Sequence, residues 1–388
     1  MEIFRKTILS PLQKIINDSR SVGIILFCCT IFSLTLSNMA NGEGYLRIWN
    51  HEFHYPAYLH LPHSILGWIN DGLMACFFFT VAMEIKREII HGELSSVRNA
   101  ILPVAAAMGG MLMPALIFAL INRHTVFSNG WGIPMATDIA FSLGITSLLG
   151  KRVPASLKIF LTALAIIDDL GAILVIAVFY GGSIHVYFLL AALCITAILF
   201  ALPYLKVPFG WWNFLLGLAL WYAIHNSGIH ATIGGVIFAF SIPRNNLLKI
   251  ERFLHVPVNF MVLPIFALAN TAILLPSDLM GAVNTGLSWG IILGLVIGKP
   301  LGIVAATYLL VKIKWGDLPQ GVSWAQITGV GMLAGIGFTM SIFIAFLAFQ
   351  ENLFQDVARI GVLLGSAISM VAGYLCLYFF SKRLTRSQ

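Results

Sequence analysis

The sequence predicts an all-α integral membrane protein with twelve transmembrane helices, and three observations lead to this fold class. Of the 388 residues, 59% are hydrophobic and only 10% are charged, whereas soluble domains carry about 25% charged residues. The apolar residues are gathered in runs close to the length of about 20 residues that crosses a bilayer. The basic residues lie almost entirely on one side of the resulting topology, as the positive-inside rule requires.

Twelve apolar runs, bounded by charge, Pro or Gly, divide the chain from end to end. Because little sequence is left between them, we expect one polytopic domain over residues 1–388 with no sizeable soluble part. The first twenty residues are polar and basic without a cleavage-site pattern, so they are expected to be an uncleaved cytoplasmic start. The runs cover residues 22–40, 65–85, 101–121, 126–149, 156–180, 185–204, 211–225, 228–242, 256–276, 288–311, 325–349 and 357–380.

The placement of Lys and Arg favours twelve spans over eleven. The seventh and eighth runs are short and separated only by residues 226–228, so they could be fused into one span. With twelve spans, only Arg47, Arg123 and Arg359 of the 23 Lys and Arg residues lie in outside segments, and only Lys299 lies within a span. Fusion would move the later basic loops outside, against the positive-inside rule. Both termini are therefore predicted to be cytoplasmic.

The longest outside connection, residues 41–64, is predicted to form a small external β-hairpin. Its residues 45–55 alternate in places between apolar and polar, as in a strand. Two HxxH spacings in this segment could hold a metal on a suitable backbone, but no acid or Cys completes a set, so we interpret them as polar ring residues at a wet membrane edge. The histidines concerned are His51, His54, His60 and His63.

Two of the runs are interrupted by helix-breaking residues. In the fourth run, Gly130, Gly132 and Pro134 precede Thr137 and Asp138, and Pro removes a backbone donor. In the eleventh run, four glycines precede residues 338–339, although glycine also serves helix packing. Broken spans indicate the binding site of a transporter. Each is the middle member of a triplet, runs 3–5 and 10–12, which predicts an inverted repeat whose broken helices, 4 and 11, cross at mid-membrane.

The fifth run carries two adjacent aspartates, Asp168 and Asp169, near the middle of the bilayer. Each costs about 2.5 to 3.5 kcal/mol there on insertion scales, and they project about 100° apart on a helix. One can pair with Lys299 in the tenth run while the other faces a cavity and offers oxygen to a small cation, with Thr137 adding a further ligand. Asp138 and Lys299 could also neutralise the positive and negative ends of the broken helices. A snorkelling lysine is the alternative for Lys299.

A buried carboxylate that binds either a proton or a metal ion exchanges one for the other, which is the minimal chemistry of an antiporter. A second group that releases a proton would make the exchange electrogenic. The chain has no GxxxxGK[ST] loop for ATP, and we expect no enzymatic activity, no cofactor and no nucleic-acid partner. A passive cation channel could use the same carboxylates. An intramembrane aspartyl protease could use Asp138 and Asp169, but its GxGD context is missing and Lys299 would have no role.

Several motifs together resemble the NhaA family of bacterial sodium/proton antiporters, from about the first span to the last. The resemblance implies crossed broken helices, electrogenic and pH-regulated exchange of cytoplasmic Na+ or Li+ for external H+, and a place in the inner membrane among lipids, serving pH homeostasis and salt tolerance. It also implies a homodimer formed through the external segment 43–64. The motifs are Ala136-Thr-Asp-Ile-Ala-Phe141, Ala165-Ile-Ile-Asp-Asp-Leu-Gly-Ala172, Gly298-Lys-Pro-Leu-Gly302, Gly228-Ile-His-Ala-Thr232, Trp68-Ile-Asn-Asp-Gly-Leu-Met74 and Met83-Glu-Ile-Lys-Arg-Glu88.

The resemblance also implies roles for individual residues. Asp169 would be the principal Na+ or Li+ ligand, and Asp168 the neighbouring ligand, proton carrier and partner of Lys299. Asp138 and Thr137 would shape the site at the broken helix. A pH-responsive set would consist of Glu84, Arg87, Glu88, Glu251 and His255, with His230 as a further pH-linked residue. On spacing alone, the acids around Arg87 would be an ordinary interfacial charge network. The chain departs from the family at Arg252, where a His is frequent, and Arg does not titrate.

Overall fold

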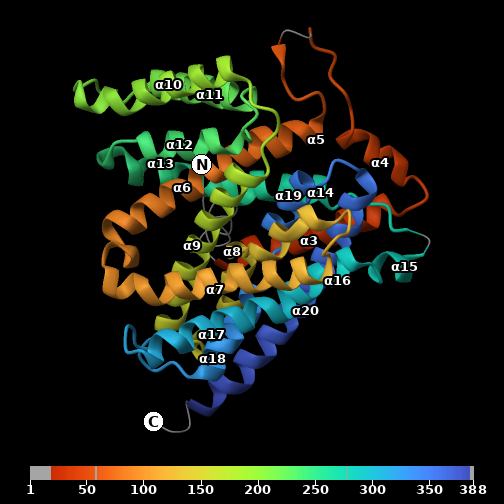
Figure 1. The fold of residues 1–388 in the computed structure, drawn as a ribbon, viewed down its shortest axis with the longest axis vertical. Helices are drawn as coiled ribbons and strands as arrows, with labels where there is room; N and C mark the ends of the chain where they lie inside the picture. The colour runs from red at the N-terminus through yellow and green to blue at the C-terminus, as the bar shows by residue number, and fades with distance from the viewer. Residues whose placement is uncertain (1–18, 57–58, 277, 385–388) are drawn as a thin grey trace, which may run out of the picture.

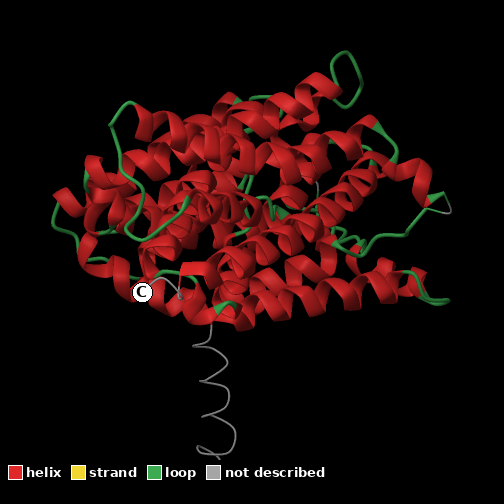
Figure 2. Ribbon diagram, turned by 90° about the horizontal axis from the view of Figure 1, so that it is seen from below, coloured by secondary structure: helices red, strands yellow, loops and turns green. Residues whose placement is uncertain are grey.

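Backbone polar groups have no water to bind inside a bilayer, so long apolar segments form helices that pair those groups internally. The computed structural model describes residues 19–56, 59–276 and 278–384, and these residues are almost entirely helical (Figures 1 and 2). The coarse prediction of an all-α membrane protein is therefore confirmed. The predicted cytoplasmic start lies outside the described residues as far as residue 18, and so do residues 385–388 at the other end.

Each predicted run contains one helix or a chain of helical segments, and three of those segments, η3, η7 and η8, are wider π-helical turns. The elements are α3 (Ser19–Ser37), α4 (Gly42–Trp49), α5 (Ile65–Gly67), η3 (Trp68–Leu73), α6 (Met74–His91), η4 (Glu93–Ser95), α7 (Val97–Ile121), η5 (Ser128–Met135), α8 (Ile139–Leu148), η6 (Gly150–Arg152), α9 (Ala155–Phe179), α10 (Val186–Tyr204), α11 (Trp211–His225), α12 (Thr232–Ser241), α13 (Arg244–Pro257), η7 (Val258–Val262), α14 (Leu263–Asn270), α15 (Leu279–Val283), α16 (Gly286–Leu293), η8 (Gly294–Gly298), α17 (Lys299–Lys312), α18 (Trp324–Ala334), α19 (Phe338–Ala348) and α20 (Asn352–Leu384).

The helices do not by themselves establish the predicted number of spans. Among the described residues, eight helices are long and apolar enough to cross a membrane, or nine if α18 and α19 form one bent span. The other predicted spans are short or divided: α11 has 15 residues and α12 has 10, against about 20 for a bilayer, and the fourth run is split between η5 and α8. The count of twelve stays a prediction.

The expected external β-hairpin is not confirmed. Its predicted first strand begins within helix α4, and the described part of residues 41–64 contains a single antiparallel bridge, between Glu52 and Ser64. Two backbone hydrogen bonds flank this bridge, from Phe53 N to His63 O at 2.7 Å and from Ile65 N to His51 O at 3.2 Å. The segment therefore consists of a helix followed by a loop that is closed on itself.

Helix α9 passes through the middle of the molecule, with α10 and α11 on one side and α17, α18 and α20 on the other (Figure 1). The helices approach closely where glycines face one another, as is usual in membrane bundles. At the crossing of α7 and α17, a Cβ atom on Gly302 would lie only 2.0 Å from the carbonyl oxygen of Gly109. This packing holds α17, and with it Lys299, against α7.

Both predicted helix breaks are present, and they contact each other. One is the non-helical stretch 136–138 between η5 and α8, and the other is the stretch 335–337, where α18 and α19 are bent by 45°. Asp138 N donates to Ile336 O at 2.6 Å across the contact. Backbone groups that the two helices leave unpaired thus bind one another inside the protein, which is the condition for irregular backbone at membrane depth.

Candidate functional site

Asp138 joins the two broken helices through its carboxylate. Its Oδ1 accepts a hydrogen bond from Phe141 N of α8 at 3.1 Å. Its Oδ2 accepts from Thr339 N at 3.0 Å and from Thr339 Oγ1 at 2.5 Å, both on α19. The side chain is only 2% exposed. One negative charge therefore faces the positive N-terminal ends of two helices, an arrangement that stabilises the carboxylate.

Lys299 lies on the other side of the crossing and is fully buried, as are its two partners. Its Nζ donates to Asp168 Oδ2 at 2.5 Å and to Thr137 Oγ1 at 2.9 Å. Thr137 Oγ1 in turn donates to Ala334 O at 2.8 Å, at the C-terminal end of α18. The ammonium group is thus positioned between a carboxylate and the negative end of a broken helix.

Asp169 projects from a different face of α9 and is held differently from Asp168. It is 2% exposed, and its Oδ1 has no hydrogen-bond partner in the described structure. Buried polar atoms of this kind normally bind water or an ion. Asp169 lines a cavity of about 390 Å3 together with Thr137, Asp138 and Thr339. Asp168 Oδ1 also has no partner, but of the two aspartates only Asp169 lines this cavity.

The same cavity connects the helix crossing with a charged cluster at the ends of α6 and α13. Its lining includes Glu84 of α6 and His255 of α13, as well as the residues around Asp169. The remaining wall is mostly apolar and comes from α3, α6, α8 and the helices that follow α13. Glu84 and Asp169 thus line one and the same cavity.

The charged cluster is centred on Arg87, which bridges α6 and α13. Its guanidinium contacts Glu84 at 3.6 Å and Glu88 at 2.9 Å, and it donates to the buried Glu251 of α13. His255 lies one turn further along α13 than Glu251. Its Nε2 is 3.1 Å from Asn259 Nδ2, and the residue lines the cavity instead of joining the Arg87 contacts. The structure thus brings together four of the five residues expected in the pH-responsive set and places the fifth beside them.

His230 lies apart from that cluster, on a second polar cavity of about 360 Å3. Its Nε2 is 3.4 Å from Asp71 Oδ1, and His225 Nδ1 is 3.9 Å from Asp71 Oδ2. Asp71 and His225 were not predicted as site residues, and neither was Thr339, the partner of Asp138. Asp71 could have been predicted from the sequence, because it is an acidic residue inside the second apolar run. The same reasoning selected Asp168. We call this second cavity the outer vestibule.

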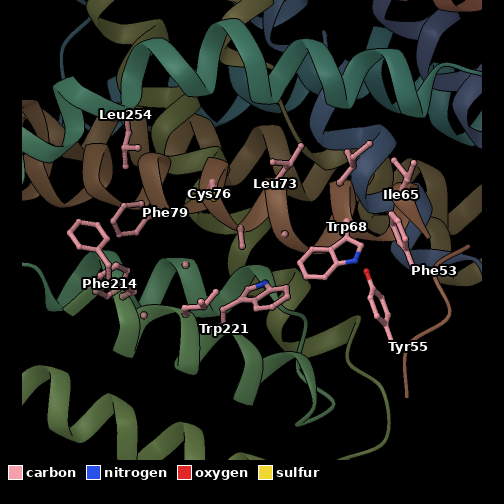
Figure 3. A pocket seen from close by; sticks show the side chains of 17 residues that line it. Phe53, Tyr55, Ile65, Trp68, Leu73, Cys76, Phe79, Phe214, Trp221 and Leu254 are labelled. Atoms are coloured by element: carbon pink, nitrogen blue, oxygen red, sulfur yellow. The ribbon is translucent and has the colours of Figure 1, made fainter. Parts of the chain in front are cut away.

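A third cavity is larger, about 720 Å3, but its chemistry does not suit an ion. It opens between α6 and α11, and aromatic side chains such as Trp68, Trp221 and Tyr55 surround it (Figure 3). None of its lining residues, all within the described ranges, is charged. The external histidines likewise form no site: no group of three or more His, Cys, Asp or Glu side chains in the described part of the chain could hold a metal ion.

The fold and the helix crossing define the class: a multi-pass membrane protein with a buried centre of charged side chains between two broken helices, an architecture that secondary transporters use. Comparison with known sequences then identifies the family. A sequence model of the Na+/H+ antiporter 1 family matches residues 13–377, and the chain belongs to this family.

Curated relatives match over nearly their full length. The Na+/H+ antiporter NhaA 2 of Flavobacterium johnsoniae is 49% identical over 374 residues, which cover 94% of this chain and 92% of that protein. The Na+/H+ antiporter NhaA of Rhizobium etli is 44% identical over 390 residues, covering 97% and 98%. The NhaA of Dechloromonas aromatica is 46% identical over 375 residues, covering 94% and 95%. The resemblance seen in the motifs is confirmed.

Proposed function

We propose that this protein is a sodium/proton antiporter and not an enzyme. The observation that carries the proposal is Asp169, a buried carboxylate with an unpartnered oxygen at the end of a cavity. Membership of the Na+/H+ antiporter 1 family supports the same function. The substrates are Na+ and H+, and Li+ is expected to replace Na+ because both are small, hard cations that prefer oxygen ligands.

Exchange follows from competition at the carboxylates. When Asp169 is ionised, it binds Na+ with help from the oxygen of Thr137; when it is protonated, it releases the ion. Asp168 contributes if Lys299 moves away from it, because its second oxygen, Oδ1, also has no partner. Release of a second proton from the Asp168–Lys299 pair for each Na+ makes the exchange electrogenic, so a proton gradient and a membrane potential both drive it.

Alternating access uses the two broken helices as the moving parts. Spans 3–5 (α7, η5 with α8, and α9) and spans 10–12 (α16 with α17, α18 with α19, and α20) form the inverted repeat, within a fold of twelve spans. The cavity at Asp169 opens beside the basic, cytoplasmic ends of α6 and α13, so the described conformation faces inward. Cytoplasmic Na+ leaves in exchange for external H+, across the inner membrane of a bacterium, with both termini in the cytoplasm.

Regulation and assembly complete the proposal. The Arg87 cluster, with His255 beside it, responds to pH at the inner end of the cavity, and His230 responds in the outer vestibule. Arg252 is exposed and takes no part in the Arg87 contacts. Two copies associate through the external segment 43–64, whose helix α4 lies at the edge of the molecule (Figure 1), and lipid surrounds the dimer.

Inside-out membrane vesicles test the function directly. Respiration acidifies their lumen, a pH-sensitive dye reports the gradient, and pulses of Na+, Li+ or K+ follow. Na+ and Li+ are expected to collapse the gradient, whereas a passive channel would carry Na+ without moving protons. If neither ion collapses it at any pH between about 6 and 9, where carboxyl and imidazole groups with shifted pKa values titrate, the proposed function is wrong.

Asp169→Asn tests the site within the same assay. The amide keeps the shape of the side chain but neither carries a charge nor exchanges a proton, so exchange should fall to background. Asp317→Asn is the matched control, because Asp317 is exposed in the loop before α18 and its substitution should leave exchange unchanged. Wild-type activity in the Asp169→Asn protein would rule out Asp169 as the ion ligand.

A further inference from the structure

Helix α19 begins at the crossing, next to Asp138, and its first N–H groups are bound by a side chain from another helix. Gly337 N and Phe338 N both donate to Ser366 Oγ, each at 3.2 Å. Ser366 lies on α20 and is 6% exposed. The next N–H group, that of Thr339, donates to Asp138. Side chains from two different spans, Ser366 and Asp138, thus accept the hydrogen bonds of the N–H groups at the start of α19.

The sequence of α19 leaves this end without a cap of its own. The residue at the N-cap position is Gly337, which has no side chain to accept the free N–H groups that open every helix. A side chain at this position would have to displace the hydroxyl of Ser341, because its Cβ atom would lie 2.1 Å from Ser341 Oγ, and it would crowd Ala136 O at 3.1 Å. The close contact between the two broken helices therefore favours a glycine at this position, and the hydrogen bonds that cap α19 come from other helices.

We infer that Ser366 is a positioning residue of the transport site. By holding the first turn of α19 against α20, it sets where the N–H and hydroxyl groups of Thr339 meet Asp138. Asp138 and Thr339 both line the cavity of Asp169, so the position of this turn determines the geometry in which the ion binds. The inference rests on the proposed antiport function.

Ser366→Ala tests the inference, and Ser369→Ala is its matched control. Ser369 lies one turn further along α20, is 1% exposed, and its hydroxyl has no partner in the described structure. Both substitutions remove one buried hydroxyl from the same helix. We expect the Na+ concentration for half-maximal exchange to rise roughly fivefold in Ser366→Ala, the factor equivalent to about 1 kcal/mol for a lost helix cap, with the maximal rate per amount of protein unchanged.

The control variants show whether Ser366 positions the start of α19. Ser369→Ala should keep the wild-type Na+ dependence, and Ser366→Thr, which retains a hydroxyl, should recover most of the affinity that Ser366→Ala loses. Equal Na+ dependences in the two alanine variants would overturn the inference, and so would a loss in Ser366→Ala confined to the maximal rate. If the wild-type protein itself fails to respond to Na+, the proposed function has failed instead.

Discussion

Lys299 and Asp168 form a buried ion pair, and separating the two charges inside the protein would cost free energy. Both side chains are fully buried, 2.5 Å apart, and removing charges from water costs several kcal/mol for each ion. Their mutual attraction and the hydroxyl of Thr137 offset this cost in the described state. Any step in which Lys299 releases Asp168 must supply a new partner to the carboxylate, and an arriving Na+ is a partner of the right charge.

Lys299→Gln should therefore destabilise the protein strongly, because it leaves Asp168 buried and unpaired. Breaking a buried pair costs about 3 to 5 kcal/mol, which should lower the midpoint of thermal unfolding of the purified protein in detergent. Lys312→Gln, at the exposed end of the same helix, should not. The double variant Lys299→Gln with Asp168→Asn should recover most of the lost stability. A double variant as unstable as the single one would show that the pair is not what stabilises this crossing.

The residues at the crossing were not equally predictable from sequence. A charged residue in an apolar run is rare enough to stand out, so Asp168, Asp169 and Lys299 could be selected at once. Thr339 could not, because hydroxyl side chains are common in membrane helices and usually bind their own helix, as Thr30 Oγ1 does with Leu26 O at 2.8 Å. Which hydroxyl reaches across to Asp138 depends on how two distant helices pack, and a single sequence does not contain that information.

At the scale of elements, breaks were predictable and the external segment was not. Both broken spans were predicted where helix-breaking residues are clustered, and both were placed correctly, whereas the isolated Pro103 and Pro114 leave α7 continuous. In the external segment, a short alternation suggested a strand, but contacts four residues apart stabilise helix α4 instead. Glu43 pairs with Arg47 at 3.2 Å, and Tyr45 packs edge-on against Trp49 at 5.7 Å between ring centroids. Such pairs favour a helix, and they outweigh a weak period of two.

The crossing of α7 and α17 gives a prediction about packing. In Gly302→Ala, the new methyl group would meet the carbonyl of Gly109, so the helices must separate, at a cost of about 1 to 3 kcal/mol for an overpacked core. Gly44→Ala in the exposed helix α4, where nothing lies within 4 Å of the new atom, should not destabilise the protein. Thermal unfolding in detergent measures both. Equal midpoints for the two variants would mean that the close approach is not needed for stability.

The link between α6 and α13 gives a prediction about regulation. Arg87→Gln removes the only cation among the contacts with Glu84, Glu88 and Glu251 in the described structure, so the charge balance of this cluster changes. The pH of half-maximal exchange should move by roughly one unit, the usual spread of carboxyl pKa values in folded proteins. Arg252→Gln is the control, because Arg252 is exposed and lies next to Glu251 on α13. Identical pH profiles for both variants and the wild type would place pH sensing elsewhere.

At the scale of the whole molecule, two polar cavities of the described structure share no lining residue. The cavity at Asp169 leads to the Arg87 cluster, whereas the outer vestibule holds Asp71 and His230. Under the proposed alternating access, an ion passes from one to the other at the contact between the broken helices, whose movement gates transport. This arrangement requires the two cavities to open on opposite faces of the membrane, which in turn depends on α11 and α12 being two separate spans.

Chemical labelling tests whether α11 and α12 are two separate spans. Asn226 follows α11, and twelve spans place it outside, whereas fusion of α11 with α12 would not return the chain to that face. In a background with the five native cysteines replaced by serine, Asn226→Cys should react with a membrane-impermeant maleimide in right-side-out vesicles. Asn50→Cys, at the end of α4, should react in the same vesicles, and Arg252→Cys only in inside-out ones. Labelling of Asn226→Cys from the same face as Arg252→Cys would exclude twelve spans, because the short helices α11 and α12 would then not each cross the bilayer.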